Sequence, residues 1–188
     1  MKHHINIVII ALRVILFASG LMCVYNLVRA FGFIMDDNTK EIYDYFHIYF
    51  TPLTPSVTKS INALGNTYFP NIQWLAIGFP IAYTALIIYG MSGIVRLYKC
   101  LLKIEKGQIF YTEQGVQFRK VGGTIIIFAK IKYLLFCFTG IIVYFDVSTL
   151  AKQLPELLTL YLFGKLILIM SYMAEKGEFI KEENDLTV

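Results

Sequence analysis

The segment IQWLAIGFPIAYTALIIYGMSGIV, residues 72–95, decides the fold class, because it is apolar for long enough to cross a membrane. A bilayer core about 30 Å thick needs roughly 20 apolar residues in a helix. A lone strand cannot cross lipid, because its unpaired backbone groups would find no hydrogen-bond partner there. The segment therefore predicts a membrane-spanning helix.

Three further segments have the same character, so we expect four spans. The spans are about residues 5–35, 72–95, 121–145 and 157–174. The first is longer than a bilayer requires and contains Arg13 and Arg29, so its membrane part is either Ile5–Tyr25 or Val14–Met35. The fourth has Pro155 at its start, where proline is tolerated in the first helical turn. These features predict an all-α, integral membrane four-helix bundle that forms one domain over the whole chain.

The overall composition also points to a membrane protein. Of the 188 residues, 57% are hydrophobic and 16% are charged, and the mean hydropathy is +0.62. A soluble domain has roughly 45–50% apolar and about 25% charged residues. This chain has too little polar surface to cover a soluble globule of its size. The composition excludes a disordered protein, a nucleic-acid-binding globule and most soluble enzymes.

The cysteines and the N-terminus say little about function. Cys23, Cys100 and Cys137 lie far apart in the sequence. They suggest neither a disulfide framework nor a zinc site, and we expect small buried side chains. The basic start of the chain leads into an apolar run without a small-residue cleavage site, which predicts an uncleaved first helix.

The sizeable loop between the first two spans, residues 36–71, is rich in aromatic residues. Its first part, Ile42–Phe50, contains three tyrosines and two phenylalanines. Tyrosine is favoured where its ring is buried and its hydroxyl is wet, so we expect a short interfacial helix here. Pro52 and Pro55 should end that helix. We favour a plain aromatic collar over a site at which a ligand stacks.

The basic residues predict the orientation. Residues 96–120, the loop between the second and third spans, hold six basic and two acidic residues, while residues 36–70 have a net charge of −2. Basic loops stay in the cytoplasm. We therefore expect residues 36–71 to be the outer loop and residues 96–120 the inner loop, with both termini, including the tail 175–188, in the cytoplasm. The formal net charge of +4 therefore indicates the orientation of the chain in the membrane. We expect no direct contact with nucleic acid.

A short internal repeat follows the second and fourth spans. Glu105-Lys106-Gly107 and Glu175-Lys176-Gly177 lie 70 residues apart, and each glycine is followed six residues later by an acid, Glu113 or Glu183. The repeat suggests a duplicated helical hairpin. Each glycine can end a helix in the left-handed conformation, with the phenylalanine that follows, Phe110 in the first copy, folding back to the interface. Thr112 would cap a short new helix over residues 113–120. We favour a helix stop with an interfacial turn over a pair of cytoplasmic docking elements.

The same two regions resemble a known family. Residues 101–113, LLKIEKGQIFYTE, and residues 178–188, EFIKEENDLTV with Asp185 near its end, are similar to two signatures of a bacterial membrane family, number 2975 among the domains of unknown function. The long aromatic loop has no match in that family. The resemblance implies a multi-pass protein of the bacterial cytoplasmic (inner) membrane without an assigned activity. It also implies an association with a small helix-turn-helix regulator encoded nearby.

Three lysines lie inside the predicted spans. Lys130 and Lys132 belong to the third span and Lys165 to the fourth. A lysine at mid-bilayer costs about 2.5–3.5 kcal/mol on insertion scales. Lys130 and Lys165 should lie at similar depth, and Asp146 is the nearest acid in the third span, too far along the helix to pair. We favour snorkelling, with the third span shifted to about Ala129–Thr149, over a basic cavity for an anion, an anionic lipid head or an acidic peptide.

No motif of nucleotide binding, metalloprotease or hydrolase chemistry is present, so we expect no enzyme, no catalytic or metal site and no cofactor. We expect a regulatory or interaction protein that engages a cytoplasmic partner such as a small DNA-binding regulator. The alternative is a small transporter, channel or resistance protein that uses the intramembrane lysines. The other expected partners are the lipid bilayer and a second copy of the chain. The candidate functional residues are Lys130, Lys132, Lys165, Glu105, Gly107, Phe110, Glu113, Glu175, Gly177, Glu183 and Asp185.

Overall fold

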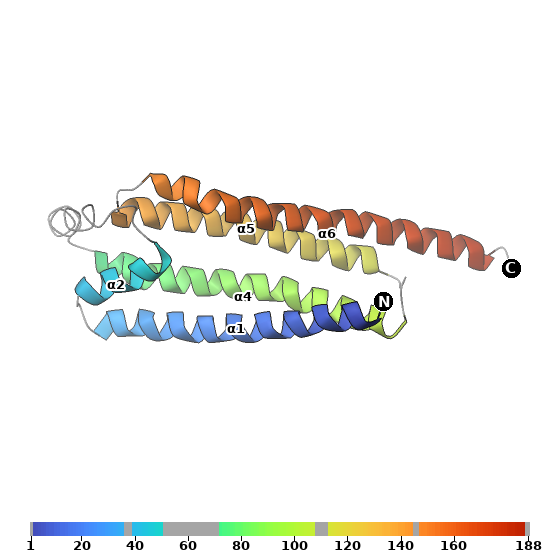
Figure 1. The fold of residues 1–188 in the computed structure, drawn as a ribbon, viewed down its shortest axis with the longest axis horizontal. Coiled ribbons are helices and arrows are strands. Elements are labelled where there is room, and N and C mark those ends of the chain that lie inside the picture. Colours follow the sequence, from blue (N-terminus) through green and yellow to red (C-terminus); the bar gives the residue numbers. More distant parts are fainter. Residues whose placement is uncertain (1, 36–38, 51–71, 108–112, 145–146, 187–188) are drawn as a thin grey trace. The chain divides into compact units, whose positions relative to one another are not determined.

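The chain is helical in the computed structural model, which describes residues 2–35, 39–50, 72–107, 113–144 and 147–186. These ranges contain five helices and no strand. The helices are α1 (Lys2–Met35), α2 (Thr39–Tyr49), α4 (Ile72–Glu105), α5 (Gln114–Tyr144) and α6 (Ser148–Leu186) (Figure 1). Helices α1, α4, α5 and α6 are each long and apolar enough to cross a membrane. The prediction of an all-α fold with four membrane-length helices is confirmed, and the chain is a multi-pass membrane protein.

The exposed side chains agree with a lipid environment. Phe17 of α1 is 71% exposed, Leu134 of α5 is 65% exposed and Leu162 of α6 is 60% exposed. Soluble monomers rarely expose large contiguous apolar surfaces. In lipid the same surfaces are favourable, because the hydrocarbon chains are as apolar as the side chains.

Two expected helix boundaries were wrong. Helix α6 begins at Ser148, so Pro155 lies inside it and not in its first turn. A proline inside a membrane helix is tolerated where local adjustments satisfy the backbone group that loses its partner. Helix α5 begins at Gln114 and continues to Tyr144, so residues 114–120 are its first two turns and not a separate short helix.

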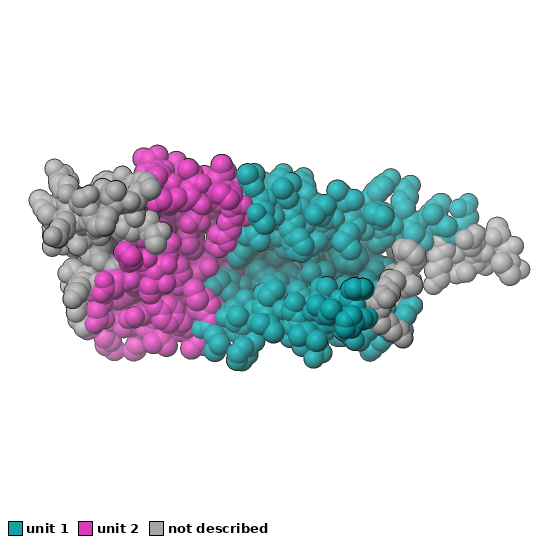
Figure 2. All heavy atoms as spheres, in the orientation of Figure 1, with its two compact units in different colours: residues 1–21, 87–130, 158–188 teal, residues 22–86, 131–157 magenta. Residues whose placement is uncertain are grey.

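The chain divides into two compact units, each built from parts of several helices (Figure 2). Unit 1 comprises residues 1–21, 87–130 and 158–188. Unit 2 comprises residues 22–86 and 131–157.

Unit 1 has a small apolar core between α4, α5 and α6. Its buried members are Cys100, Phe118, Val121, Ile167 and Ala174. Helices α4 and α5 run antiparallel, because residues 90 and 93 of α4 lie against residues 128 and 124 of α5. A Cβ on Gly90 would meet Phe128, and a Cβ on Gly93 would meet Thr124. Glycines thus allow α4 and α5 to approach closely.

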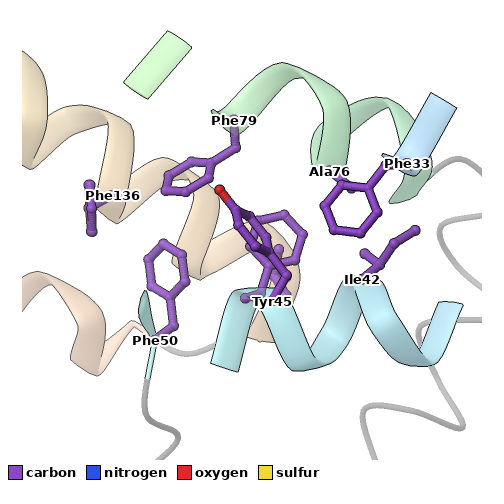
Figure 3. Packing of buried hydrophobic residues seen from close by; sticks show 9 residues of the cluster. Phe33, Ile42, Tyr45, Phe50, Ala76, Phe79 and Phe136 are labelled. Carbon is purple, nitrogen blue, oxygen red and sulfur yellow. The ribbon is translucent and has the colours of Figure 1, made fainter. Parts of the chain in front are cut away.

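Unit 2 has an aromatic core that helix α2 completes. Ile42, Tyr45 and Phe46 of α2 are 1% exposed or less. They pack with Phe50 against aromatic side chains from the long helices, among them Phe79 and others labelled in the close-up (Figure 3). Ile42, Tyr45 and Phe46 have the spacing of one helical face. The predicted short helix is confirmed by α2. Pro52 and Pro55, expected to end it, lie outside the described residues.

The polar centre of this core is Asn26 of α1. The hydroxyls of Tyr45 and Tyr49 both donate to its Oδ1, over 2.9 Å and 2.8 Å. Burial raises the pKa of both tyrosine hydroxyls above their ordinary value. The two hydroxyls therefore stay protonated as donors, and they fix α2 on α1 through one amide oxygen.

Candidate functional site

The register of α5 and α6 in unit 1 positions the candidate charged residues. A Cβ on Gly122 would lie 2.9 Å from the carbonyl oxygen of Gly164, so the two backbones touch there. Seven residues further along each helix, in opposite directions, Ser171 Oγ donates to the carbonyl oxygen of Gly115 over 2.6 Å. These two contacts fix an antiparallel pair. These glycines were not predicted as contact residues, although their spacing of seven residues places Gly115 and Gly122 on one face of α5.

Lys130 and Lys165 converge on one aromatic ring. Lys130 Nζ lies 5.9 Å from the ring centroid of Tyr161, and Lys165 Nζ lies 5.5 Å from the same centroid. Both lysines are exposed on unit 1. The cation–π attraction to a tyrosine ring is worth about 0.5–2 kcal/mol depending on desolvation. Tyr161 was not predicted as a site residue, although its position four residues before Lys165 places both on one face of α6.

Lys132 has a different environment from the other two lysines. It forms an ion pair with Glu156 of α6, and its side chain is only 15% exposed. Its Nζ also lies 5.2 Å from the ring centroid of Phe136. Lys132 therefore has an acid within reach, whereas the sequence pointed only to Asp146, too far along the helix from Lys130 to pair. That acid comes from the neighbouring helix and not from Asp146, which lies outside the described residues.

Two contacts mark a polar end of unit 1, which we define by Arg13, Tyr98, Arg119 and Glu175. Arg13 donates to the Tyr98 hydroxyl from Nε over 3.0 Å and from Nη2 over 2.8 Å. Arg119 donates from Nη2 to Glu175 Oε1 over 2.5 Å. Glu175 also lies against Gly115, where a Cβ would meet the Glu175 side chain. The predicted site residue Glu175 thus joins α6 to the first turns of α5.

The two copies of the Glu-Lys-Gly repeat have different structures. Helix α4 ends at Glu105, which is half-buried, and Gly107 follows with a φ of 89°. This left-handed conformation is the predicted helix stop. Gly177, in contrast, lies inside α6, which continues to Leu186, so the second predicted stop was wrong. Residues 178–182 include three good helix formers, Glu178, Lys181 and Glu182, whereas residues 108–112 include one, Gln108.

The start of α5 also differs from the prediction. Glu113 has a φ of 71°, and its carbonyl oxygen accepts a bond from the Gln117 N–H over 3.0 Å. Glu113 is thus the residue that precedes the first helical turn, the place predicted for Thr112. Thr112 and Phe110 lie outside the described residues. Glu183 and Asp185 belong to the last turns of α6, where Glu183 is exposed.

The described residues contain no group of three or more His, Cys, Asp or Glu side chains that could hold a metal ion. No family model, no curated protein and no solved structure matches the chain. The resemblance of residues 101–113 and 178–188 to a bacterial membrane family therefore stays a prediction.

Proposed function

We propose that this chain is a regulatory or interaction protein of the bacterial cytoplasmic membrane that presents the end of α6 to a cytoplasmic protein partner. One observation carries the proposal. Helix α6 continues for nine residues beyond the membrane-length segment that ends at Gly177. Phe179 and Ile180, at the start of this extension, are 62% and 57% exposed.

The sequence of the extension supports a soluble partner. Residues 178–186 hold five charged residues, so this part of α6 is suited to water and not to lipid. Adjacent exposed phenylalanine and isoleucine side chains on a charged helix suit an apolar groove on a folded domain, in the way that amphipathic helices bind. The basic residues of 96–120 favour a cytoplasmic location for this end. The family resemblance favours a small helix-turn-helix regulator as the partner.

The test measures binding of the full chain in detergent to the purified small helix-turn-helix protein that the family resemblance predicts beside its gene. We expect the double substitution Phe179→Ala with Ile180→Ala to weaken binding at least tenfold, and removal of residues 182–188 to weaken it as well. The matched control replaces Leu162 and Phe163, an exposed apolar pair within the membrane-length part of α6, with alanine. That control should keep wild-type affinity. Absence of binding by the wild-type chain, or equal loss in both double variants, would contradict the proposal.

A further inference from the structure

Unit 1 carries two cations on its surface that belong to none of its ion pairs. In the part of the chain that the structure describes, the ion pairs are Arg29–Glu41, Arg119–Glu175 and Lys132–Glu156. Lys130 and Lys165 are absent from this set, and both lie against the ring of Tyr161. A single tyrosine ring thus collects two positive charges that no described carboxylate balances.

The depth of this pair follows from the helix geometry. Lys130 follows Arg119 by 11 residues in α5, and Lys165 precedes Glu175 by 10 residues in α6. At 1.5 Å per residue these separations are about 16 Å and about 15 Å. Because Arg119 and Glu175 belong to the polar end of unit 1, both lysines lie about half a hydrocarbon thickness away from it. A lysine stem is too short to return its ammonium group to that end.

The surface around the pair is apolar and exposed. Ile127 of α5 is 46% exposed, and Leu158, Leu162 and Leu166 of α6 are between 50% and 60% exposed. These side chains flank the lysines at helical spacing. A headgroup of a phospholipid would need to leave the interface to reach this depth, whereas an apolar helix reaches it by crossing the bilayer.

We propose that Lys130, Tyr161 and Lys165 form the docking site for a membrane-spanning helix of another protein that carries an aspartate or glutamate near its centre. One carboxylate that accepts from both ammonium groups neutralises one of the two positive charges. Apolar residues before and after it pack on the leucines of α6 and on Ile127. A charge-assisted contact of this kind is strong where water is excluded.

A second copy of this chain does not fit the site. Helix α1 contains no acidic residue, α4 contains only Glu105 at its end, and α5 contains none. In the membrane-length part of α6, Glu156 pairs with Lys132 and Glu175 pairs with Arg119. The described membrane-length helices thus offer no free carboxylate near their centres, so we assign the complement to a different chain. This surface is separate from the extension of α6 beyond Gly177.

The test uses the full chain in vesicles of zwitterionic lipid and three synthetic probes. Each probe is a labelled polyleucine membrane helix with Glu, Leu or Lys at its central position, and energy transfer reports binding. We expect the Glu probe to bind at least ten times more tightly than the Leu probe, with the Lys probe weakest. Equal binding of the three probes to the wild-type chain would overturn the proposal, and this comparison requires no variant to fold.

Variants then locate the site. Lys130→Gln combined with Lys165→Gln should remove the preference for the Glu probe, and Lys130→Arg combined with Lys165→Arg should keep it. The control is Lys176→Gln, because Lys176 also lies on a tyrosine ring, that of Tyr172, but beyond the level of Glu175. That control should leave the preference intact. A preference that survives loss of both lysines would overturn the proposal, as would lysine-dependent binding of anionic lipid or anion flux without any preference among the probes.

Discussion

Gly122 and Gly164 bring α5 and α6 into backbone contact, since a Cβ on Gly122 would lie 2.9 Å from the Gly164 carbonyl oxygen. The adjacent Gly123 has open space where its Cβ would be. This difference between neighbouring glycines gives a matched test of the helix packing.

Gly122→Ala should destabilise the protein, because the new methyl group must push the helices apart. Overpacking of this kind costs about 1–3 kcal/mol. Gly123→Ala should be neutral or stabilising by up to about 1 kcal/mol, because alanine favours a helix over glycine. Unfolding of both variants in detergent, followed by circular dichroism, measures the difference. Equal stability of the two variants would show that the backbones do not touch.

The ion pair between Lys132 and Glu156 should be visible as an energetic coupling. Because the Lys132 side chain is largely buried, we expect a coupling free energy of about 0.5–3 kcal/mol in a double-mutant cycle of Lys132→Ala and Glu156→Ala. The control cycle combines Glu156→Ala with Arg29→Ala, whose ion-pair partner is Glu41. Its effects should add. A coupling that is the same in both cycles would argue against the pair.

Tyr45 should make the stability depend on pH in the alkaline range. Burial raises the pKa of its hydroxyl. Below pH about 10 the hydroxyl is protonated in both the folded and the unfolded state, so the folded state keeps its full stability. Above that pH the unfolded tyrosine ionises while the folded one stays protonated, and the free energy of unfolding falls.

Tyr45→Phe tests this directly. The variant should lose about 0.5–1.5 kcal/mol at neutral pH, because one hydrogen bond to Asn26 is removed. It should also lose less stability than the wild type between about pH 8 and about pH 11. Denaturant titrations at the two pH values measure both effects. Identical alkaline losses in the two proteins would contradict the role assigned to Tyr45.

The two glycines of the repeated motif should respond with opposite signs. Gly107→Ala should destabilise by about 1 kcal/mol or more, because alanine is strained at a positive φ. Gly177→Ala should stabilise by about 0.5–1 kcal/mol, because it lies inside a helix. Thermal unfolding of the two variants measures both changes in stability. A loss of stability in both variants would indicate that Gly177 also ends a helix.

The four spans and the short aromatic helix could be predicted because each depends on a local pattern. Residues 72–95 are apolar throughout, and Ile42, Tyr45 and Phe46 share one helical face. The partner of Lys132 could not be predicted in this way. Glu156 reaches it only through the register of α5 against α6, which depends on which residues let the helices approach.

The two identical tripeptides show a second limit of local reasoning. Glu105-Lys106-Gly107 and Glu175-Lys176-Gly177 have the same letters, yet only the first ends a helix. After Gly107 the chain must reverse to enter α5, and the residues there are weaker helix formers. After Gly177 the charged residues continue the helix to Leu186.

The continuity of α6 gives its end a mechanical property. From Leu158 to Leu186 one helix runs within unit 1, a length of about 42 Å. A change in tilt of about ten degrees moves the far end of such a rod by about 7 Å. Membrane helices change tilt when the bilayer becomes thinner or thicker. A tilt of α6 that followed the bilayer thickness would displace Phe179 and Ile180, and this helix would then convert a property of the membrane into a displacement in water.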